Sequence, residues 1–156
     1  MIEREIDLET DDGTMKTFIY HPAHDGPHPV VLYLMDAPSI RPALHQMASR
    51  LATAGYYVMM PYLFYRGGEF RVFGEEDSEM HQRRELMQSV NPTNILGDAE
   101  AMLEFAADDP DADDGDIGAV GFCMSGGLVI SLARAWPERV AAAASIHGAW
   151  MVKDTP

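Results

Sequence analysis

The heptapeptide GFCMSGG, at residues 121–127, holds the only cysteine of this 156-residue chain. Cys123 stands between two apolar runs, and Gly121, Gly126 and Gly127 surround it with small residues. Small neighbours allow a sharp turn from strand to helix, which presents a nucleophile at the carboxyl edge of a sheet. The alternative is an inert core residue, since free cysteines are commonly buried. We favour the nucleophile.

The spacing around Cys123 matches the nucleophile-elbow pattern G-x-S-x-G, with cysteine in the nucleophile's place and Ser125 in the last position. Ser125 is the weaker candidate nucleophile, because an elbow centred on it requires glycine at position 123. The start of the following helix stabilises a thiolate through its dipole and its free N–H groups. We expect the backbone N–H of Met124 to face a developing oxyanion.

Asp36 is a second residue that could take part in chemistry. It directly follows the apolar run PVVLYLM at residues 29–35, which has the pattern of a strand buried on both faces. That position places it at the same sheet edge as Cys123, where a partly buried acid changes the titration of a nearby thiol. The alternative is a loop-start residue that caps local backbone N–H groups. The residues alone leave both readings open.

The elements that must position these residues alternate between strands and helices through most of the chain. Such alternation predicts an α/β fold, a three-layer α/β/α sandwich with a mostly parallel sheet. Strands are expected at 2–8 and 15–20 (an opening hairpin), 29–35, 56–60, 116–122 and 141–146, and helices at 42–54, 95–106 and 124–135. We expect residues 62–93 to be polar and irregular, with a helix in the 80s.

Two further clusters resemble metal sites at first sight. The acidic stretch 108–116 fails as a calcium loop, because Asp114 and Val120 occupy the positions that require glycine and glutamate, and we expect a solvated loop. The histidines His21, His24 and His28 lack the cysteine or carboxylate spacing of a zinc site. We therefore expect no metal, and without a dinucleotide fingerprint we expect no cofactor.

Composition limits the classes of function. The formal net charge of −14 argues against binding nucleic acid or an anionic membrane. The apolar runs are too short to span a bilayer, and the charged N-terminus lacks the apolar region of a signal peptide. A single cysteine excludes an intramolecular disulfide and fits a reducing compartment, so we expect a cytoplasmic protein. With 47% hydrophobic residues, the chain suits one compact domain.

With GFCMSGG, the segment LMDAPSIRPALHQMASRLATAGYYVMMPYLFYR and the strand before each, the chain resembles the dienelactone hydrolases. These form a branch of the α/β-hydrolase fold that uses a Cys–His–Asp triad. The resemblance runs from the opening hairpin to SIHG at 145–148. It implies a hydrolase that cleaves a lactone or small carboxylic ester through a cysteine nucleophile and an acyl-enzyme.

The resemblance also implies roles for individual residues. Asp36 stands where the family has an acidic residue that interacts with the resting cysteine, although the best-known members have glutamate there. The second oxyanion donor would be the N–H of Ala37. Arg83 or Arg84 would hold a substrate carboxylate, and the alternative for both is a solvated helix face.

The family's triad acid and histidine follow the strand expected at 141–146, and they have no counterpart in this chain. We therefore expect residues 1–156 to form a single hydrolase domain that is incomplete at its C-terminus, with little or no turnover. His147 is a candidate substitute for the histidine, or else a structural residue that bonds to loop backbone. The last strand would leave an exposed edge that permits self-association. The alternative function is a thiol redox sensor or a small-molecule binding protein.

Overall fold

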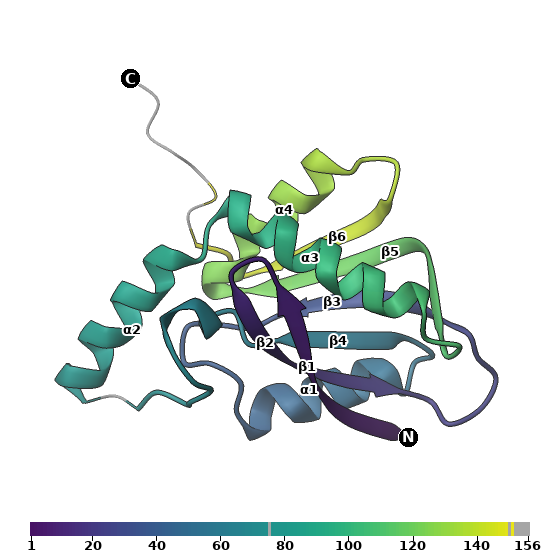
Figure 1. The fold of residues 1–156 in the computed structure, drawn as a ribbon, viewed down its shortest axis with the longest axis horizontal. Coiled ribbons are helices and arrows are strands. Elements are labelled where there is room, and N and C mark those ends of the chain that lie inside the picture. Colours follow the sequence, from purple (N-terminus) through teal and green to yellow (C-terminus); the bar gives the residue numbers. More distant parts are fainter. Residues whose placement is uncertain (75, 150, 152–156) are drawn as a thin grey trace.

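A six-stranded sheet forms the middle layer of the computed structural model, which describes residues 1–74, 76–149 and 151. Its strands are β1 (Ile2–Thr10), β2 (Gly13–His21), β3 (His28–Leu34), β4 (Tyr57–Pro61), β5 (Ala112–Phe122) and β6 (Val140–Ile146). Their order across the sheet is β1-β2-β4-β3-β5-β6 (Figure 1). The neighbours among β4, β3, β5 and β6 are parallel, whereas β2 pairs antiparallel with both β1 and β4.

Helices cover both faces of this sheet. They are α1 (Pro42–Ala52), α2 (Asp77–Ser89), α3 (Pro92–Ala107) and α4 (Gly126–Ala135), with the short 3₁₀ helices η1 (Tyr65–Gly67) and η2 (Cys123–Ser125). Helix α1 packs against β2 and β4 on one face, and α3 and α4 pack against β5 and each other on the opposite face (Figure 1). The three-layer α/β/α architecture expected from the alternating elements is confirmed.

The central strands owe their place to sequence runs without polar residues. Val30 to Leu34 of β3 are all buried, and so is every residue of β4, as expected for parallel strands covered on both faces. Helix α1 buries the stripe of Leu44, Ala48 and Ala52, which recur at helical spacing. The Asn91 side chain caps α3 by accepting from the N–H groups of the second and third helical residues, at 3.0 and 3.1 Å.

The segment after β4 is only in part the polar region expected from sequence, because several of its residues belong to the core. Tyr62, Leu63 and Phe64 are almost fully buried, and Phe73 is only 5% exposed. These side chains enter the core from irregular backbone, so they follow no strand or helix period and the pattern did not reveal them. The helix expected in the 80s is present as α2, which begins somewhat earlier, at Asp77.

The acidic stretch 108–116 is likewise more than a solvated loop. Strand β5 begins at Ala112, and Asp109 is only 8% exposed. Tyr57 donates a hydrogen bond of 2.7 Å to the Asp109 carboxylate, and Arg4 forms an ion pair with the same oxygen. Burial alone would raise the pKa of Asp109, but these hydrogen bonds hold it below its usual value.

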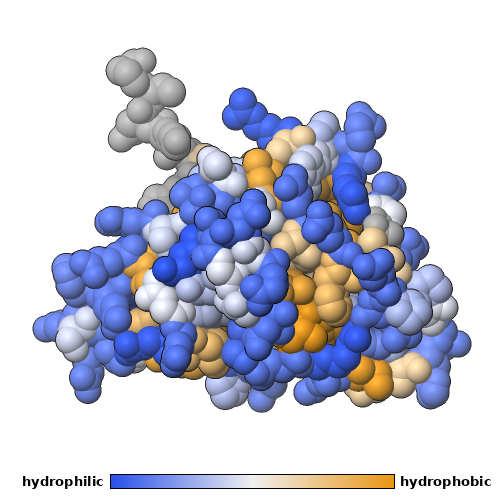
Figure 2. Space-filling view, viewed as in Figure 1, coloured by the Kyte–Doolittle hydropathy of each residue, from blue (hydrophilic) through white to orange (hydrophobic). Residues whose placement is uncertain are grey.

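Hydrophilic residues dominate the face of the molecule drawn in Figure 2, and hydrophobic residues show between them in patches. Within the described residues, none of the helices combines the length and the hydropathy that crossing a bilayer requires.

Strand β6 forms one edge of the sheet and is covered on one face by α4. Residues 141–144 are exposed, and Ile146 is 43% exposed. Within the described residues β6 pairs only with β5, so its outer backbone groups lack a strand partner. An unpaired apolar edge of this kind is a template for another strand.

Replacing Asp109 by asparagine is expected to lower the free energy of unfolding by about 1–3 kcal/mol, because the buried Tyr57 hydroxyl and Arg4 lose their charged acceptor. The pKa of Asp109 is lowered in the folded protein, so its carboxylate stabilises the fold fully at pH values above the ordinary aspartate pKa. This stabilisation is lost as the pH falls through the lowered pKa. Urea denaturation measures both effects. Asp108→Asn, at an exposed neighbour, is the matched control, and equal losses in the two variants would contradict the assignment.

Residues 1–156 are expected to self-associate through β6. A charge on the edge opposes such pairing, so Ala144→Lys is expected to shift the population toward monomer. Size-exclusion chromatography with light scattering, run over a range of protein concentrations, measures the mass. A monodisperse monomer for the unsubstituted chain at every concentration refutes the prediction.

Candidate functional site around Cys123

Cys123 occupies the turn that joins β5 to α4. Its φ is +52°, in the left-handed region that non-glycine residues seldom adopt, and its side chain is half-buried. The turn follows the carboxyl end of β5, beside the carboxyl ends of the parallel strands β3 and β6. Open α/β sheets bind their ligands at this edge.

Two glycines make the turn possible, and each is required by a close backbone approach. A Cβ at Gly121 would lie 2.3 Å from the carbonyl oxygen of Ser125, and one at Gly126 would lie 2.4 Å from the Cα of Gly148. Real Cβ atoms do not approach other atoms this closely. The small residues that flank Cys123 therefore serve the turn itself, as the sequence predicted.

Ser125 is fully buried and does not face the solvent. Its hydroxyl donates a hydrogen bond of 2.5 Å to the carbonyl oxygen of Met35, just beyond the end of β3. The bond links the turn after β5 to the loop after β3. A buried hydroxyl engaged in this way is a poor nucleophile, which agrees with the preference for Cys123.

Asp36 lies at the same edge as Cys123. Leu34 pairs with Gly121 at the end of the β3–β5 ladder, so Asp36 and Cys123 each stand two residues beyond that pair. The Asp36 carboxylate is buried and accepts two hydrogen bonds from Arg41, from Nη1 to Oδ1 at 2.5 Å and from Nη2 to Oδ2 at 2.8 Å. Within the described residues, neither the Cys123 thiol nor a backbone N–H bonds to this carboxylate.

Arg41 was not anticipated as part of the site. Its hydrogen bonds to Asp36 raise the pKa of its guanidinium above the ordinary value, which leaves it charged at any working pH. The buried Tyr33 hydroxyl faces the same pair, and burial followed by the charge of Asp36 raises the pKa of Tyr33 to about 12. The available signal was an acid and an arginine five residues apart on one short loop.

The segment after β6 also reaches the turn. The N–H of Ala149 donates to the carbonyl oxygen of Cys123 at 2.8 Å. His147 is exposed, has a φ of +41°, and its ring centre lies 6.4 Å from that of Phe122. The fold thus brings His147 to the edge that carries Cys123, and within the described residues its ring makes no hydrogen bond.

The other predicted residues lie on different parts of the molecule. Arg83 is half-buried and Arg84 exposed on α2, which packs mainly on η1 and projects away from the sheet (Figure 1). His21 and His28 are buried at the end of β2 and the start of β3, away from the carboxyl ends of the parallel strands, and His24 is exposed. No group of three or more His, Cys, Asp or Glu side chains suited to a metal ion occurs among the described residues.

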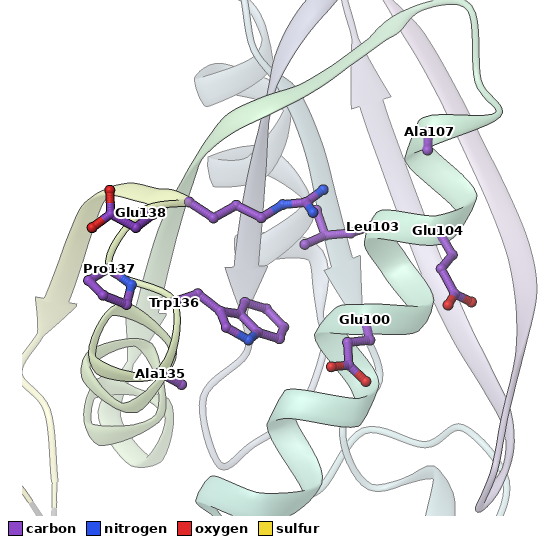
Figure 3. Close-up of a pocket in the computed structure, with 9 residues that line it drawn as sticks. Glu100, Leu103, Glu104, Ala107, Ala135, Trp136, Pro137 and Glu138 are labelled. Carbon is purple, nitrogen blue, oxygen red and sulfur yellow. The ribbon is translucent and has the colours of Figure 1, made fainter.

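A surface groove lies between α3 and the connection from α4 to β6, where Trp136 faces Leu103 and Glu100 (Figure 3). Helix α4 separates this groove from Cys123, because Trp136 follows the last residue of the helix and Cys123 precedes the first. Ten residues of helix span about 15 Å. The groove is therefore not part of the site at Cys123.

Comparisons with known proteins identify relatives of this chain. A proposed carboxymethylenebutenolidase of Methylorubrum extorquens is 26% identical over 126 residues, covering 81% of this chain and 42% of the relative. The carboxymethylenebutenolidase of Pseudomonas putida is 26% identical over 135 residues, covering 85% of this chain and 56% of the relative. The chain thus spans about half the length of these curated relatives.

The fold has counterparts among solved structures. A proposed dienelactone hydrolase of Klebsiella pneumoniae superposes with a TM-score of 0.82 at 21% sequence identity, covering 99% of this chain and 62% of that one. The family model described as "Dienelactone hydrolase family" matches residues 15–156. This chain belongs to the dienelactone hydrolase family.

Proposed function

We propose that the protein is a hydrolase of lactones or small carboxylic esters in which Cys123 is the nucleophile of a nucleophile elbow. The observation that carries the proposal is the placement of Cys123 at a φ of +52° between a buried parallel strand and a helix. A thiol held there projects from the edge where such sheets bind ligands. Membership of the dienelactone hydrolase family supports the same class of reaction.

The first half of the reaction is acylation. The Cys123 thiolate attacks the carbonyl carbon, a C–S bond forms, and the carbonyl electron pair moves onto oxygen. The N–H groups of Met124 and Ala37 donate to this oxyanion. The intermediate then collapses, the C–O bond to the alcohol breaks, and the alkoxide takes a proton from solvent. It leaves as an alcohol or, in a lactone, stays as a hydroxyl at the other end of the same molecule.

The second half is hydrolysis of the thioester. Water adds to the acyl carbon, its proton passes to a base, and the sulfur leaves as thiolate with release of the carboxylic acid. Within residues 1–156 the candidate base is His147, which lies at the edge that carries Cys123. The relatives are about twice as long as the segment that they share with this chain. The hydrolase activity of the whole protein is therefore proposed here.

The names of the relatives, which are carboxymethylenebutenolidases, support a proposal for the substrate class. We propose a small lactone or ester of that kind, with Arg83 or Arg84 as the partner of a carboxylate on it. No cofactor takes part in the proposed chemistry, no nucleic acid or membrane is a proposed partner, and the cytoplasm is the proposed location.

With p-nitrophenyl acetate, residues 1–156 are expected to release a burst of about one p-nitrophenolate per chain, followed by slow turnover, because acylation needs only the thiol and the oxyanion donors. Cys123→Ala is expected to abolish the burst, and Ser131→Ala, at the serine of α4, to leave it unchanged. Stopped-flow absorbance measures both phases. A burst that survives in Cys123→Ala contradicts the proposal, and oxidation of Cys123 by peroxide without any burst favours the redox-sensor alternative.

The Asp36–Arg41 pair is expected to control the reactivity of Cys123. Arg41→Met leaves a buried carboxylate unpaired at the sheet edge that carries the thiol, which disfavours the thiolate, and Asp36→Asn leaves the arginine cation, which favours it. Alkylation by iodoacetamide at pH 7 is expected to slow about fivefold in the first variant and to accelerate by a similar factor in the second, for a charge interaction of about 1 kcal/mol. Arg50→Met, at an exposed arginine of α1, is the control. Changes of the same sign in both variants would argue against a charge effect.

A further inference from the structure

We propose that Ser125 is a positioning residue that fixes the separation of the two oxyanion donors, the N–H groups of Met124 and Ala37. The inference rests on the proposed function, and it assigns a role to a residue that stands where the elbow pattern G-x-S-x-G has glycine. Glycine carries no side-chain donor at this position, whereas Ser125 carries a hydroxyl.

The two donors belong to different segments of the chain. Met124 follows β5 and Ala37 follows β3, and the last pair of the ladder between these strands is Leu34 with Gly121. Beyond that pair β3 and β5 no longer pair with each other, so the sheet does not set the distance between the Ala37 and Met124 N–H groups. A contact between the loops has to do so if both N–H groups are to meet one oxygen atom.

The Ser125 hydroxyl supplies such a contact. It donates to the Met35 carbonyl oxygen at 2.5 Å, between residues 90 positions apart in sequence. Ser125 is adjacent to Met124, and the Met35 carbonyl lies one peptide unit before the Ala37 N–H. The anchored peptide plane ends at the Asp36 nitrogen, so the φ and ψ angles of Asp36 are the only free rotations between it and the plane that carries the Ala37 N–H.

The surroundings leave this link little freedom. Ser125 and Met35 are 0% exposed, and Met124 is 1% exposed. The Ser125 carbonyl lies against Gly121, where a Cβ would approach within 2.3 Å, so the serine backbone cannot shift toward β5. On the other side, the N–H of Ser39 donates to the Asp36 carbonyl at 3.1 Å and closes the turn that carries Ala37.

A donor pair must meet the oxyanion at about 2.7–3.1 Å, and a displacement of about 1 Å costs roughly a hundredfold in rate. Loss of the Ser125 hydroxyl is therefore expected to lower the stability of any tetrahedral adduct that carries an oxyanion on the carbon bonded to Cys123. It leaves direct alkylation of the thiol unchanged, because displacement of iodide from iodoacetamide forms no oxyanion.

The test uses Ser125→Ala and Ser125→Gly in residues 1–156, with Ser131→Ala as the matched control, because the Ser131 hydroxyl bonds to the Gly127 carbonyl within α4. The probe is an aryl trifluoromethyl ketone. The Cys123 thiol loses its proton to solvent, its sulfur bonds to the carbonyl carbon, and the oxygen keeps the negative charge. Fluorine NMR measures the dissociation constant of this adduct, and iodoacetamide measures thiol reactivity.

The expected result is an adduct about 10- to 100-fold weaker in both Ser125 variants, with alkylation rates within about twofold of the unsubstituted chain and no change in Ser131→Ala. Adducts of equal strength in all the proteins overturn the role of Ser125 alone. Loss of alkylation together with the adduct overturns it as well, since the serine would then only hold the turn together. An unsubstituted chain that is alkylated but forms no adduct overturns the oxyanion assignment, and with it the proposed function.

Discussion

The close approach of backbone at the end of β5 is the constraint on which the site depends. Gly121 lets the Ser125 carbonyl fold back against the strand, and Gly126 lets the start of α4 touch Gly148. Any side chain at either glycine would push the helix away from the sheet. Because the turn is this tight, Cys123 takes a left-handed conformation at the carboxyl edge of the sheet, beside the ends of β3 and β6.

Buried carboxylates in this acidic chain are paired with arginine side chains. The three aspartates found buried in the part of the chain that the structure describes each meet an arginine, Asp36 with Arg41, Asp98 with Arg66 and Asp109 with Arg4. Burying a carboxylate is costly unless it is paired and hydrogen-bonded. Two of the pairs also accept a buried tyrosine hydroxyl and join distant segments of the fold. The third lies at the proposed active site, where its net neutrality keeps an isolated negative charge away from the thiol.

The regular elements were accessible from the sequence because continuous apolar runs and helical stripes carry a period. The turn at Cys123 was also accessible from sequence, because the glycines that it requires lie close to Cys123 along the chain. Arg41, Asp109 and the buried aromatic residues from Tyr62 to Phe73 were missed. Their partners are set by loop conformation or by strands far away in sequence, and no period along the chain encodes such contacts.

The most direct test of this account is a crystal structure of residues 1–156 with a trifluoromethyl ketone bound. We expect a tetrahedral carbon bonded to the Cys123 sulfur, with its oxygen about 2.7–3.1 Å from both the Met124 and the Ala37 nitrogen atoms. An adduct whose oxygen points to solvent, or a ketone bound away from Cys123, would contradict the central claim that this turn is built for acyl transfer.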